Sequence, residues 1–214
     1  MEKIITIKEA VSKIKDGMTI MIGGFLSSGS PEKLISALAE TGVKNLTLIS
    51  NDTTYLDKGI GKLIANKQIA KLHTSHIGTN PQTSEQLNSG ELIIEFCPQG
   101  TLAERIRAGG NGLGGILTPT GLGTIIAEGK EIIKVDGKEY LLEKPLKADV
   151  ALIRASLGDK SGNLVYKGTS QNFNPIMATA ADLVIAEIGE LVEVGEIPAE
   201  NIKTQAIFVD YIVQ

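Results

Sequence analysis

The sequence predicts an α/β protein with an open, mostly parallel, twisted sheet and helices on both of its faces. Two observations support this fold class. Short runs of aliphatic and β-branched residues alternate with helical patterns through the first half of the chain, and the runs end in Gly, Ser, Asn or Pro. Such alternation is typical of parallel sheets that helices cover on both faces. Because the sequence shows no linker and no internal repeat, we expect one domain over residues 1–214.

The predicted helices follow from capping signals and apolar periodicity. The first begins after Thr6, because Thr6 and Glu9 have the spacing of a capping box. Further helices are predicted over residues 31–41, 60–65, 84–89, 102–108 and 174–181.

The predicted strands are short apolar runs between turn residues. They cover residues 19–22, 46–49, 71–76, 92–97, 150–154, 164–166, 183–186 and 206–209. Asp136-Gly137 separates two further runs, which is a strong signal for a small β-hairpin excursion over residues 131–142.

The stretch from Asp16 to Pro31 is the one on which the rest of the prediction depends. Thr19–Ile22 predicts a buried strand, and Gly23-Gly24 removes side chains where the strand ends, so that another backbone or a ligand can come close. Ser30 is expected to cap a helix whose first residue is Pro31. Free backbone amides facing that helix N-terminus would suit a phosphate or another anion. The alternative, in which the glycines serve only the turn, is equally compatible with the sequence.

The glycine-rich stretches do not form the common nucleotide or hydrolase motifs. Gly24 and Gly29 have the spacing of a P-loop, but Ser30-Pro31 stands where Lys followed by Ser or Thr is required. Ser27-Ser28 lacks the flanking glycines of a nucleophile elbow. The G-x-G-x-x-G match over 110–115 follows a helix instead of a strand, which argues against a dinucleotide site and predicts a flexible or closely packed loop.

Composition narrows the classes of function. The net charge of −4 favours neither nucleic acid nor an anionic membrane as a partner. No apolar run approaches the length of a membrane span or of a signal-peptide core, and the single cysteine permits no internal disulfide. We therefore expect a cytoplasmic protein.

Few side chains suggest a metal site or a nucleophile. His73 and His76 would point to opposite faces of a predicted strand, so no metal site is expected. Cys97 is expected to be a small buried hydrophobe. Glu95 is expected to be solvated or to cap its strand, and Arg105 is expected on a solvated helix face.

The ends of four predicted strands carry the candidate site: Gly23-Gly24-Phe25, Ser50-Asn51, Gly78-Thr79-Asn80 and Pro98-Gln99-Gly100. Ligands of parallel sheets bind beyond the carboxyl ends of the strands. Asn51 and Gln99 each follow an apolar strand, where a neutral donor can hold a carboxylate or a developing oxyanion, although a turn-stabilising role is equally compatible. The set contains no obvious nucleophile, which indicates a binding module or one half of a composite active site.

The stretch over 16–31 also resembles a family signature. It reads Asp-Gly, two residues, three apolar residues, Gly-Gly-Phe, three residues, Gly, one residue and Pro. This pattern is similar to that of the α (A) subunits of family I, 3-oxoacid-type CoA-transferases. The resemblance continues in segments 50–52, 75–81, 98–110, 118–121 and 172–174. Segments 51–53 and 76–81 look closest to the bacterial acetate/acetoacetate and butyrate–acetoacetate branch.

The resemblance implies an activity and a partner. The activity is transfer of CoA from an acyl-CoA to a free short-chain carboxylate such as acetate, acetoacetate or butyrate. In the family, a glutamate of the β (B) subunit attacks the thioester and then carries CoA as a glutamyl thioester; its Glu-Asn-Gly motif has no counterpart in this sequence. A β subunit in an α2β2 assembly is therefore expected, with CoA or acyl-CoA as a substrate and with no tightly bound cofactor.

The resemblance also assigns site residues. The family's CoA-binding loop corresponds to Gly23, Gly24, Phe25, Leu26, Ser27, Ser28 and Gly29. Gln99 and Asn51 are expected as supporting residues beside the reacting carboxylate, with Asn80 and Gly100 as further substrate contacts. Two rival functions stay open. One is a non-catalytic acyl-CoA or anion-binding module. The other is a sugar-phosphate isomerase of similar fold, which would need acid and base residues that the sequence does not offer.

Overall fold

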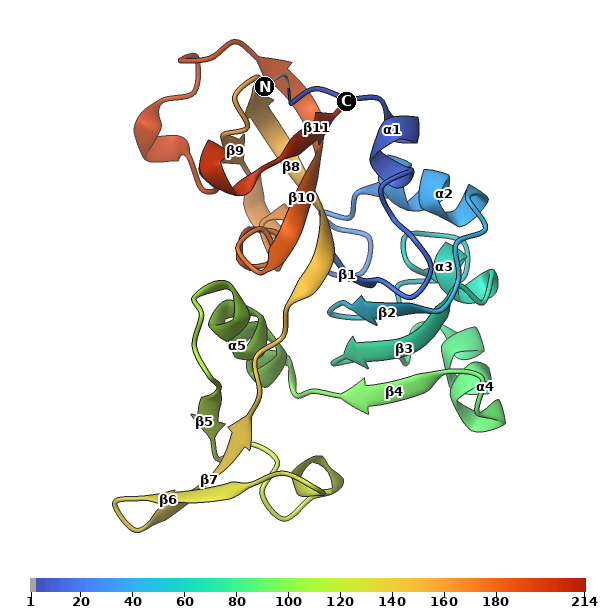
Figure 1. Ribbon diagram of the computed structural model, residues 1–214, viewed down its shortest axis with the longest axis vertical. Helices are drawn as coiled ribbons and strands as arrows, with labels where there is room; N and C mark the ends of the chain where they lie inside the picture. The colour runs from blue at the N-terminus through green and yellow to red at the C-terminus, as the bar shows by residue number, and fades with distance from the viewer. Residues whose placement is uncertain (1–2) are drawn as a thin grey trace.

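A computed structural model describes residues 3–214 and confirms the predicted α/β fold (Figure 1). The main sheet has the strand order β11-β10-β8-β1-β2-β3-β4, with β9 paired to β8. Every pair along that order is parallel, and only β9 runs antiparallel. The strands are β1 (Thr19–Ile22), β2 (Leu46–Ile49), β3 (Ile69–Thr74), β4 (Ile93–Phe96), β8 (Ala148–Asp159), β9 (Leu164–Val165), β10 (Ala181–Val192) and β11 (Tyr211–Val213).

Helices cover both faces of this sheet, as predicted. They are α1 (Ile7–Val11), α2 (Glu32–Glu40), α3 (Gly61–Ala65), α4 (Pro81–Ser89), α5 (Gln99–Gly110) and α6 (Asn174–Met177). The strand residues alternate between two apolar cores. Ile20 and Ile22 pack in the core that includes residues of α1, α2 and α3, whereas Met21 packs in the core with residues of α5 and α6. This alternation is the period of two that a pleated strand imposes.

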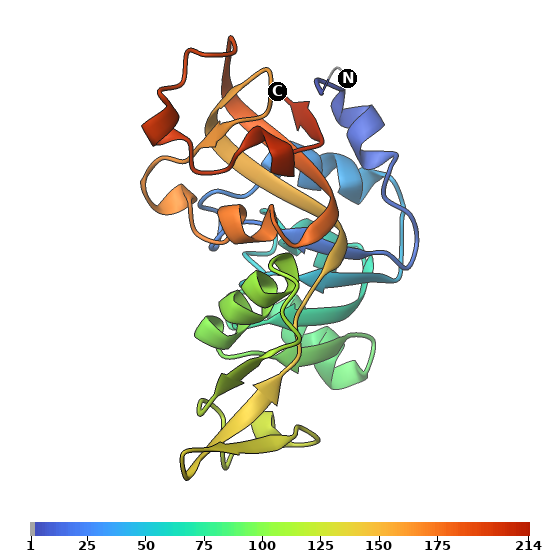
Figure 2. The same cartoon turned by 60° about the vertical axis from the view of Figure 1, so that its left-hand side comes forward.

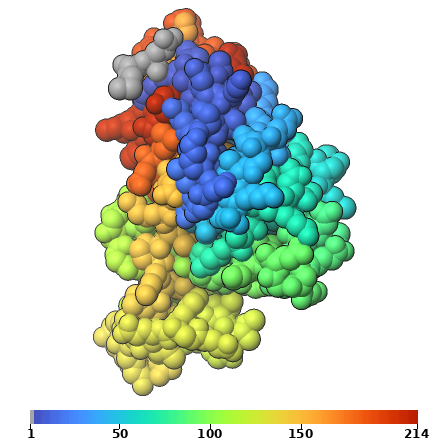
Figure 3. All heavy atoms as spheres, turned by 45° about the vertical axis from the view of Figure 1, so that its right-hand side comes forward, coloured from blue at the N-terminus to red at the C-terminus, as the bar shows by residue number. Residues whose placement is uncertain are grey.

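A small second sheet projects from one end of the molecule (Figures 2 and 3). It has the antiparallel order β5-β7-β6, from β5 (Ile116–Thr118), β6 (Ile132–Val135) and β7 (Lys138–Glu143). The predicted hairpin is confirmed, because Asp136 and Gly137 both have positive φ, at 49° and 77°. Those values suit the type I′ turn that matches the twist of a two-stranded ribbon. Strand β5 was not predicted, since its three residues lie among glycines.

Several predicted boundaries were wrong. The run over 206–209 is a 3₁₀ turn, and the last strand is β11. Ile207 is 86% exposed and Phe208 is also exposed, whereas Val209 is buried in the core, so burial along this run does not alternate as it does in a strand. Helix α5 begins at Gln99, before the predicted residue 102, and α4 begins at Pro81, before the predicted residue 84. The first turns of both helices therefore contain residues that the sequence suggested were loop. The other strands and helices are confirmed, with ends that shift by a few residues or, in β8 and β10, extend much further.

The predicted cap of α2 was also wrong. The Ser30 hydroxyl donates to the Leu26 carbonyl at 3.1 Å, and α2 begins one residue after Pro31. The amides of Lys33 and Leu34 instead donate to the Glu187 carboxylate, at 2.9 and 3.2 Å. An internal anion from β10 thus occupies the helix N-terminus that the sequence offered to a phosphate.

Burial raises the pKa of the Glu187 carboxyl, and the hydrogen bonds from Leu34 and Lys33 only partly offset this effect. We expect Glu187→Gln to leave the free energy of unfolding at pH 7 unchanged or to raise it by about 1 kcal/mol, because Gln still accepts both amide bonds without a buried charge. A carboxyl group whose pKa is higher in the folded state than in the unfolded state stabilises the fold when it is protonated. This stabilisation is fully present below the pKa of the unfolded state and is lost as pH rises through the pKa of the folded state. Urea titrations should therefore show that the free energy of unfolding of wild type rises relative to that of Glu187→Gln as pH falls. Glu187→Ala, which leaves the amides unpaired, should be destabilised at every pH; a Gln variant as unstable as the Ala variant would contradict this account.

No helix within residues 3–214 combines the length and apolar character that crossing a membrane requires. Met1 and Glu2, which open the N-terminal segment considered for a leader, lie outside the described residues.

Candidate functional site

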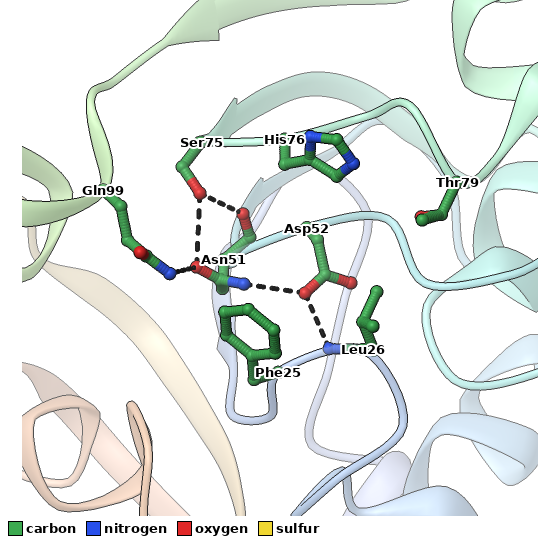
Figure 4. Close-up of a pocket in the computed structure, with 8 residues that line it drawn as sticks. All are labelled: Phe25, Leu26, Asn51, Asp52, Ser75, His76, Thr79 and Gln99. Atoms are coloured by element: carbon green, nitrogen blue, oxygen red, sulfur yellow. Dashed lines mark hydrogen bonds between the residues drawn. The ribbon is translucent and has the colours of Figure 1, made fainter.

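A cleft of about 390 Å³ opens at the carboxyl ends of β1 to β4 (Figure 4). Its lining residues are Phe25, Leu26, Asn51, Asp52, Ser75, His76, Thr79 and Gln99. Each stands in a segment that follows one of these four strands, so the edge of the sheet brings them together. The structure thereby unites four of the predicted site residues: Phe25, Leu26, Asn51 and Gln99.

A chain of hydrogen bonds crosses this cleft (Figure 4). Gln99 Nε2 donates to Asn51 Oδ1 at 2.7 Å, and Asn51 Nδ2 donates to Asp52 Oδ2 at 2.8 Å. Asp52 Oδ2 also accepts the Leu26 amide at 2.8 Å, while Asp52 Oδ1 accepts the Thr54 amide at 2.7 Å. Both Asp52 oxygens are therefore engaged in holding the backbone of the site. This leaves Asp52 poorly suited to act as a nucleophile.

The Asn51 backbone is fixed from the neighbouring strand. Its carbonyl accepts from the Thr74 hydroxyl at 3.0 Å, and from the Ser75 amide and hydroxyl at 3.1 and 2.7 Å. Asn51 is 2% exposed, whereas Gln99 is exposed at the start of α5. Within residues 3–214, the second N–H of Gln99 and its Oε1 have no hydrogen-bond partner. That N–H can donate to a carboxylate or an oxyanion in the cleft.

Four of the loop amides that the sequence suggested were free are hydrogen-bonded within the chain, whereas within residues 3–214 those of Ser27 and Gly29 have no acceptor. The Gly24 amide donates to Asn172 Oδ1 at 3.1 Å, and the Phe25 and Ser28 amides each donate to the other residue's carbonyl at 3.0 Å. With the Leu26 amide held by Asp52, these four amides have internal acceptors. What the loop presents to the cleft is the side chains of Phe25 and Leu26 (Figure 4).

Other predicted site residues lie outside the cleft lining. Gly23, Gly24, Ser27, Ser28 and Gly29 belong to the loop but do not line the cleft. Gly100 borders a separate groove of about 610 Å³ between α5 and β5.

Asn80, predicted as a substrate contact, is fully buried. Its side chain caps α4 by accepting the Gln82 amide at 3.1 Å, and it donates to the Thr53 carbonyl at 3.2 Å. The Asn-Pro pair at 80–81 is a helix-start signal, and it would have predicted this capping role from the sequence.

Sequence reasoning missed Asp52, Ser75 and His76 as lining residues, whereas Thr79 lines the cleft as its place at a predicted strand end suggested. His76 was assigned to a strand together with His73, but β3 ends at Thr74 and His76 follows it at the cleft. The available signal was position alone, because these three residues lie within a few residues of a strand end.

A second polar cluster lies between α5 and the small sheet, and it corrects two expectations. Arg105 is buried, and its Nη1 lies 2.7 Å from Glu95 Oε1, 2.9 Å from Cys97 Sγ and 3.7 Å from Glu143 Oε2. Its Nε donates to the Lys144 carbonyl at 2.8 Å. Arg105 is therefore a buried ion and not a solvated one, and its partner Glu95 is an ion-paired carboxylate that stays partly exposed. The sequence did not predict these pairings, because the partners stand in different elements of the fold.

Two side chains of this cluster have shifted pKa values. The His73 imidazole, 3.2 Å from Glu95, and then the Arg105 guanidinium hold the pKa of the Glu95 carboxyl well below its usual range, outweighing the opposite effect of burial. Burial raises the pKa of the Cys97 thiol, despite the nearby Arg105. The buried, protonated thiol agrees with the prediction that Cys97 behaves as a small hydrophobe.

His73, Glu95 and Cys97 offer donor atoms within 4.8 Å of one another, a grouping that the sequence did not suggest. The Arg105 guanidinium already contacts the carboxylate and the sulfur. A divalent cation would have to displace that buried positive charge, so the arrangement suits an ion pair better than a metal.

Comparison with known proteins agrees with this geometry. Residues 4–214 match the family of Coenzyme A transferase. The chain is 52% identical over 211 residues to the acetate CoA-transferase subunit alpha of Escherichia coli K12, covering 99% of this chain and 96% of that protein. It is 56% identical over 212 residues to the acetoacetyl-CoA:acetate/butyrate CoA transferase alpha subunit of Clostridium acetobutylicum, covering 99% and 97%.

The fold is shared with a longer enzyme. The crystal structure of an acyl-CoA transferase from E. coli O157:H7, in a thioester complex with CoA, superposes with a TM-score of 0.89 at 24% identity. The superposition covers 99% of this chain and 47% of that one, so this chain spans about half the length of that enzyme. The sequence match over nearly the whole chain, together with this fold, shows that the chain belongs to the coenzyme A transferase family.

Proposed function

We propose that this chain is the α subunit of a short-chain acyl-CoA:carboxylate CoA-transferase, moving CoA between acetyl- or butyryl-CoA and acetate, acetoacetate or butyrate. The observation that carries the proposal is the Gln99–Asn51–Asp52 chain in the cleft, which offers a neutral donor but no free nucleophile. The two relatives named above, which act on acetate, acetoacetate or butyrate by name, support this substrate class.

The chemistry then needs a carboxylate nucleophile from a partner. A glutamate of the β subunit would attack the thioester carbonyl, and CoA would leave as the thiolate, giving an acyl-glutamyl anhydride. The thiolate would next attack the glutamyl carbonyl of the anhydride and release the acyl group as a free carboxylate, leaving glutamyl-CoA. The same steps in reverse would load the second carboxylate. In each step a negative charge develops on a carbonyl oxygen, where the free N–H of Gln99 can donate.

A neutral site suits this reaction. A fixed cation would already bind the carboxylate substrate tightly in the ground state. It would then stabilise the transition state by little more than the ground state, and the reaction would be accelerated less. A carboxamide donor binds the carboxylate less strongly and still stabilises the developing oxyanion. The apolar side chains of Phe25 and Leu26 would help to keep water from the anhydride and the thioester.

Relatives named as α subunits support a β partner, and we propose an α2β2 assembly in the cytoplasm. Coenzyme A enters as a substrate in this family. The absence of a tightly bound cofactor stays a prediction, as does the single domain over residues 1–214.

The test is CoA transfer from acetyl-CoA to acetoacetate or butyrate, assayed with this chain alone and with its β partner. Transfer by the mixture only is the expected result. Binding of CoA without transfer by either sample would favour a non-catalytic binding module. Transfer by this chain alone would place the nucleophile here and overturn the proposal.

A further inference from the structure

The loop over 23–29 is held by two asparagines from a distant part of the chain. Asn172 Oδ1 accepts the Gly24 amide at 3.1 Å, and Asn172 Nδ2 donates to the Ser28 carbonyl at 2.9 Å. Asn174 Nδ2 donates to the Gly29 carbonyl at 3.0 Å. Both ends of the loop are therefore attached to carboxamides that lie more than a hundred residues away in the sequence.

The two asparagines are themselves fixed. Asn172 Oδ1 accepts the Phe173 amide at 2.7 Å, and its Nδ2 donates to the Thr169 carbonyl at 3.0 Å. Asn174 is fully buried, and its Oδ1 accepts the Arg154 amide of β8 at 3.0 Å. Strand β8 is the parallel neighbour of β1, whose end leads into the loop. The clamp thus connects the loop to the centre of the main sheet.

The clamp explains two glycines of the loop, Gly23 and Gly29. A Cβ on Gly23 would lie 1.9 Å from Asn174 Oδ1. A Cβ on Gly29 would lie 2.4 Å from the Ser170 carbonyl and 2.9 Å from Asn172 Nδ2. The close approach that the sequence suggested for a ligand is made at these positions by the chain itself.

Between the two attachments the loop makes a tight turn. Phe25 and Ser28 exchange amide–carbonyl hydrogen bonds at 3.0 Å, and Leu26 adopts a φ of 52°, a conformation that costs energy in a residue other than glycine. Asp52 holds the Leu26 amide from the cleft side. The Ser28 carbonyl accepts both the Phe25 amide and Asn172 Nδ2, so the clamp contacts the turn directly.

We propose that Asn172 and Asn174 are positioning residues for substrate: they hold the turn so that the Phe25 and Leu26 side chains form the apolar wall of the cleft against which acyl-CoA binds. This inference rests on the proposed function. Neither asparagine lines the cleft, so their effect passes through the loop. A wall that is fixed before binding adds affinity, because the substrate does not have to order it.

The test uses Asn172, because a substitution at the fully buried Asn174 could prevent the chain from folding. Asn172 has a φ of 22°, so Asn172→Gly removes the side chain at a backbone conformation that glycine tolerates. Asn172→Asp keeps the acceptor for the Gly24 amide and loses the donor to the Ser28 carbonyl. Gln171→Ala is the matched control, since Gln171 is exposed and its side chain makes no hydrogen bond within residues 3–214.

In the assembled enzyme, Asn172→Gly should raise KM for acyl-CoA by about tenfold with kcat little changed, because the lost interaction serves binding in the ground and transition states alike. Asn172→Asp should raise KM at least as far, because it places a carboxylate oxygen where Nδ2 faced the Ser28 and Thr169 carbonyls, and Gln171→Ala should match wild type. Amide hydrogen exchange supplies a second readout. Gly24 should lose protection in Asn172→Gly and keep it in Asn172→Asp.

Unchanged KM in Asn172→Gly would overturn the positioning role, and so would unchanged protection of Gly24. A fall in kcat with KM unchanged would also contradict it, since that result indicates a role in the chemical step. If wild type itself transfers no CoA, the proposed function fails. The exchange of Gly24 then still decides whether Asn172 holds the loop.

Discussion

Gln99→Ala is expected to lower kcat/KM for CoA transfer by about 100-fold in the assembled enzyme, as loss of a single oxyanion donor commonly does. Gln99 is the exposed member of the hydrogen-bonded chain, and its side chain donates one hydrogen bond, to Asn51 Oδ1 at 2.7 Å. Removing an exposed side chain at the start of α5 leaves no cavity, so the thermal unfolding midpoint should stay near that of wild type. The measurement is steady-state transfer together with a melting curve.

Two further variants sharpen this prediction. Gln99→Glu keeps the length of the side chain but places a carboxylate oxygen where an N–H faced Asn51 Oδ1, so its activity should fall at least as far. Gln205→Ala is the control for loss of an exposed glutamine remote from the cleft lining, and it should retain full activity. Full activity in Gln99→Ala would remove Gln99 from the mechanism.

Arg105→Met is expected to lower the free energy of unfolding by about 3–5 kcal/mol, the usual cost of breaking a buried ion pair by removing one partner. The guanidinium is almost fully buried between Glu95, Cys97 and Glu143, and the Glu143 side chain is only 1% exposed. Methionine fills most of the volume but removes the closest cation of Glu95, and it leaves the buried Glu143 with Lys130, 2.6 Å away, as its remaining cation. Urea unfolding at pH 7 measures the loss.

The stability difference between wild type and Arg105→Met should depend on pH. A depressed folded pKa, as at Glu95, contributes stability that is present above the unfolded pKa of about 4.3 and is lost as pH falls through the folded pKa. The gap between wild type and Arg105→Met should therefore be widest at neutral pH and narrow in acid. Arg107→Met, on the same helix, removes an exposed arginine paired with Glu104 and should change stability by no more than about 0.5 kcal/mol. Equal losses in the two variants would contradict the buried-pair account.

Local signals in the sequence were sufficient for most of the sheet. Thr19–Ile22 and Leu46–Ile49 were predicted to the residue, because each is a short apolar run between turn residues. The Asp136-Gly137 turn was equally clear, since both residues need positive φ and this pair tolerates it. The position of the cleft could be predicted from the parallel arrangement of the strands alone, because the cleft lies at their carboxyl ends.

Long-range partners were what the sequence could not show. The glycine loop was correctly placed, but its Gly24 and Leu26 amides donate to Asn172 and Asp52, and the close approach at Gly23 is made by Asn174. These partners belong to the chain itself and not to a bound ligand. Likewise Glu187, from β10, takes the N-terminus of α2. Nothing near Gly23 or Lys33 in the sequence identifies these acceptors, since they are brought close only by the folded sheet.

The central claim is that this chain supplies one wall of a composite site whose covalent chemistry occurs on its partner. The most direct test is to incubate the assembled pair with acyl-CoA alone, without an acceptor carboxylate, and to locate bound CoA by mass spectrometry of the intact chains. We expect a CoA adduct on the partner chain, lost when acceptor carboxylate is added, and this chain unmodified. A CoA adduct on residues of this chain, formed and discharged at the rate of turnover, would contradict the account.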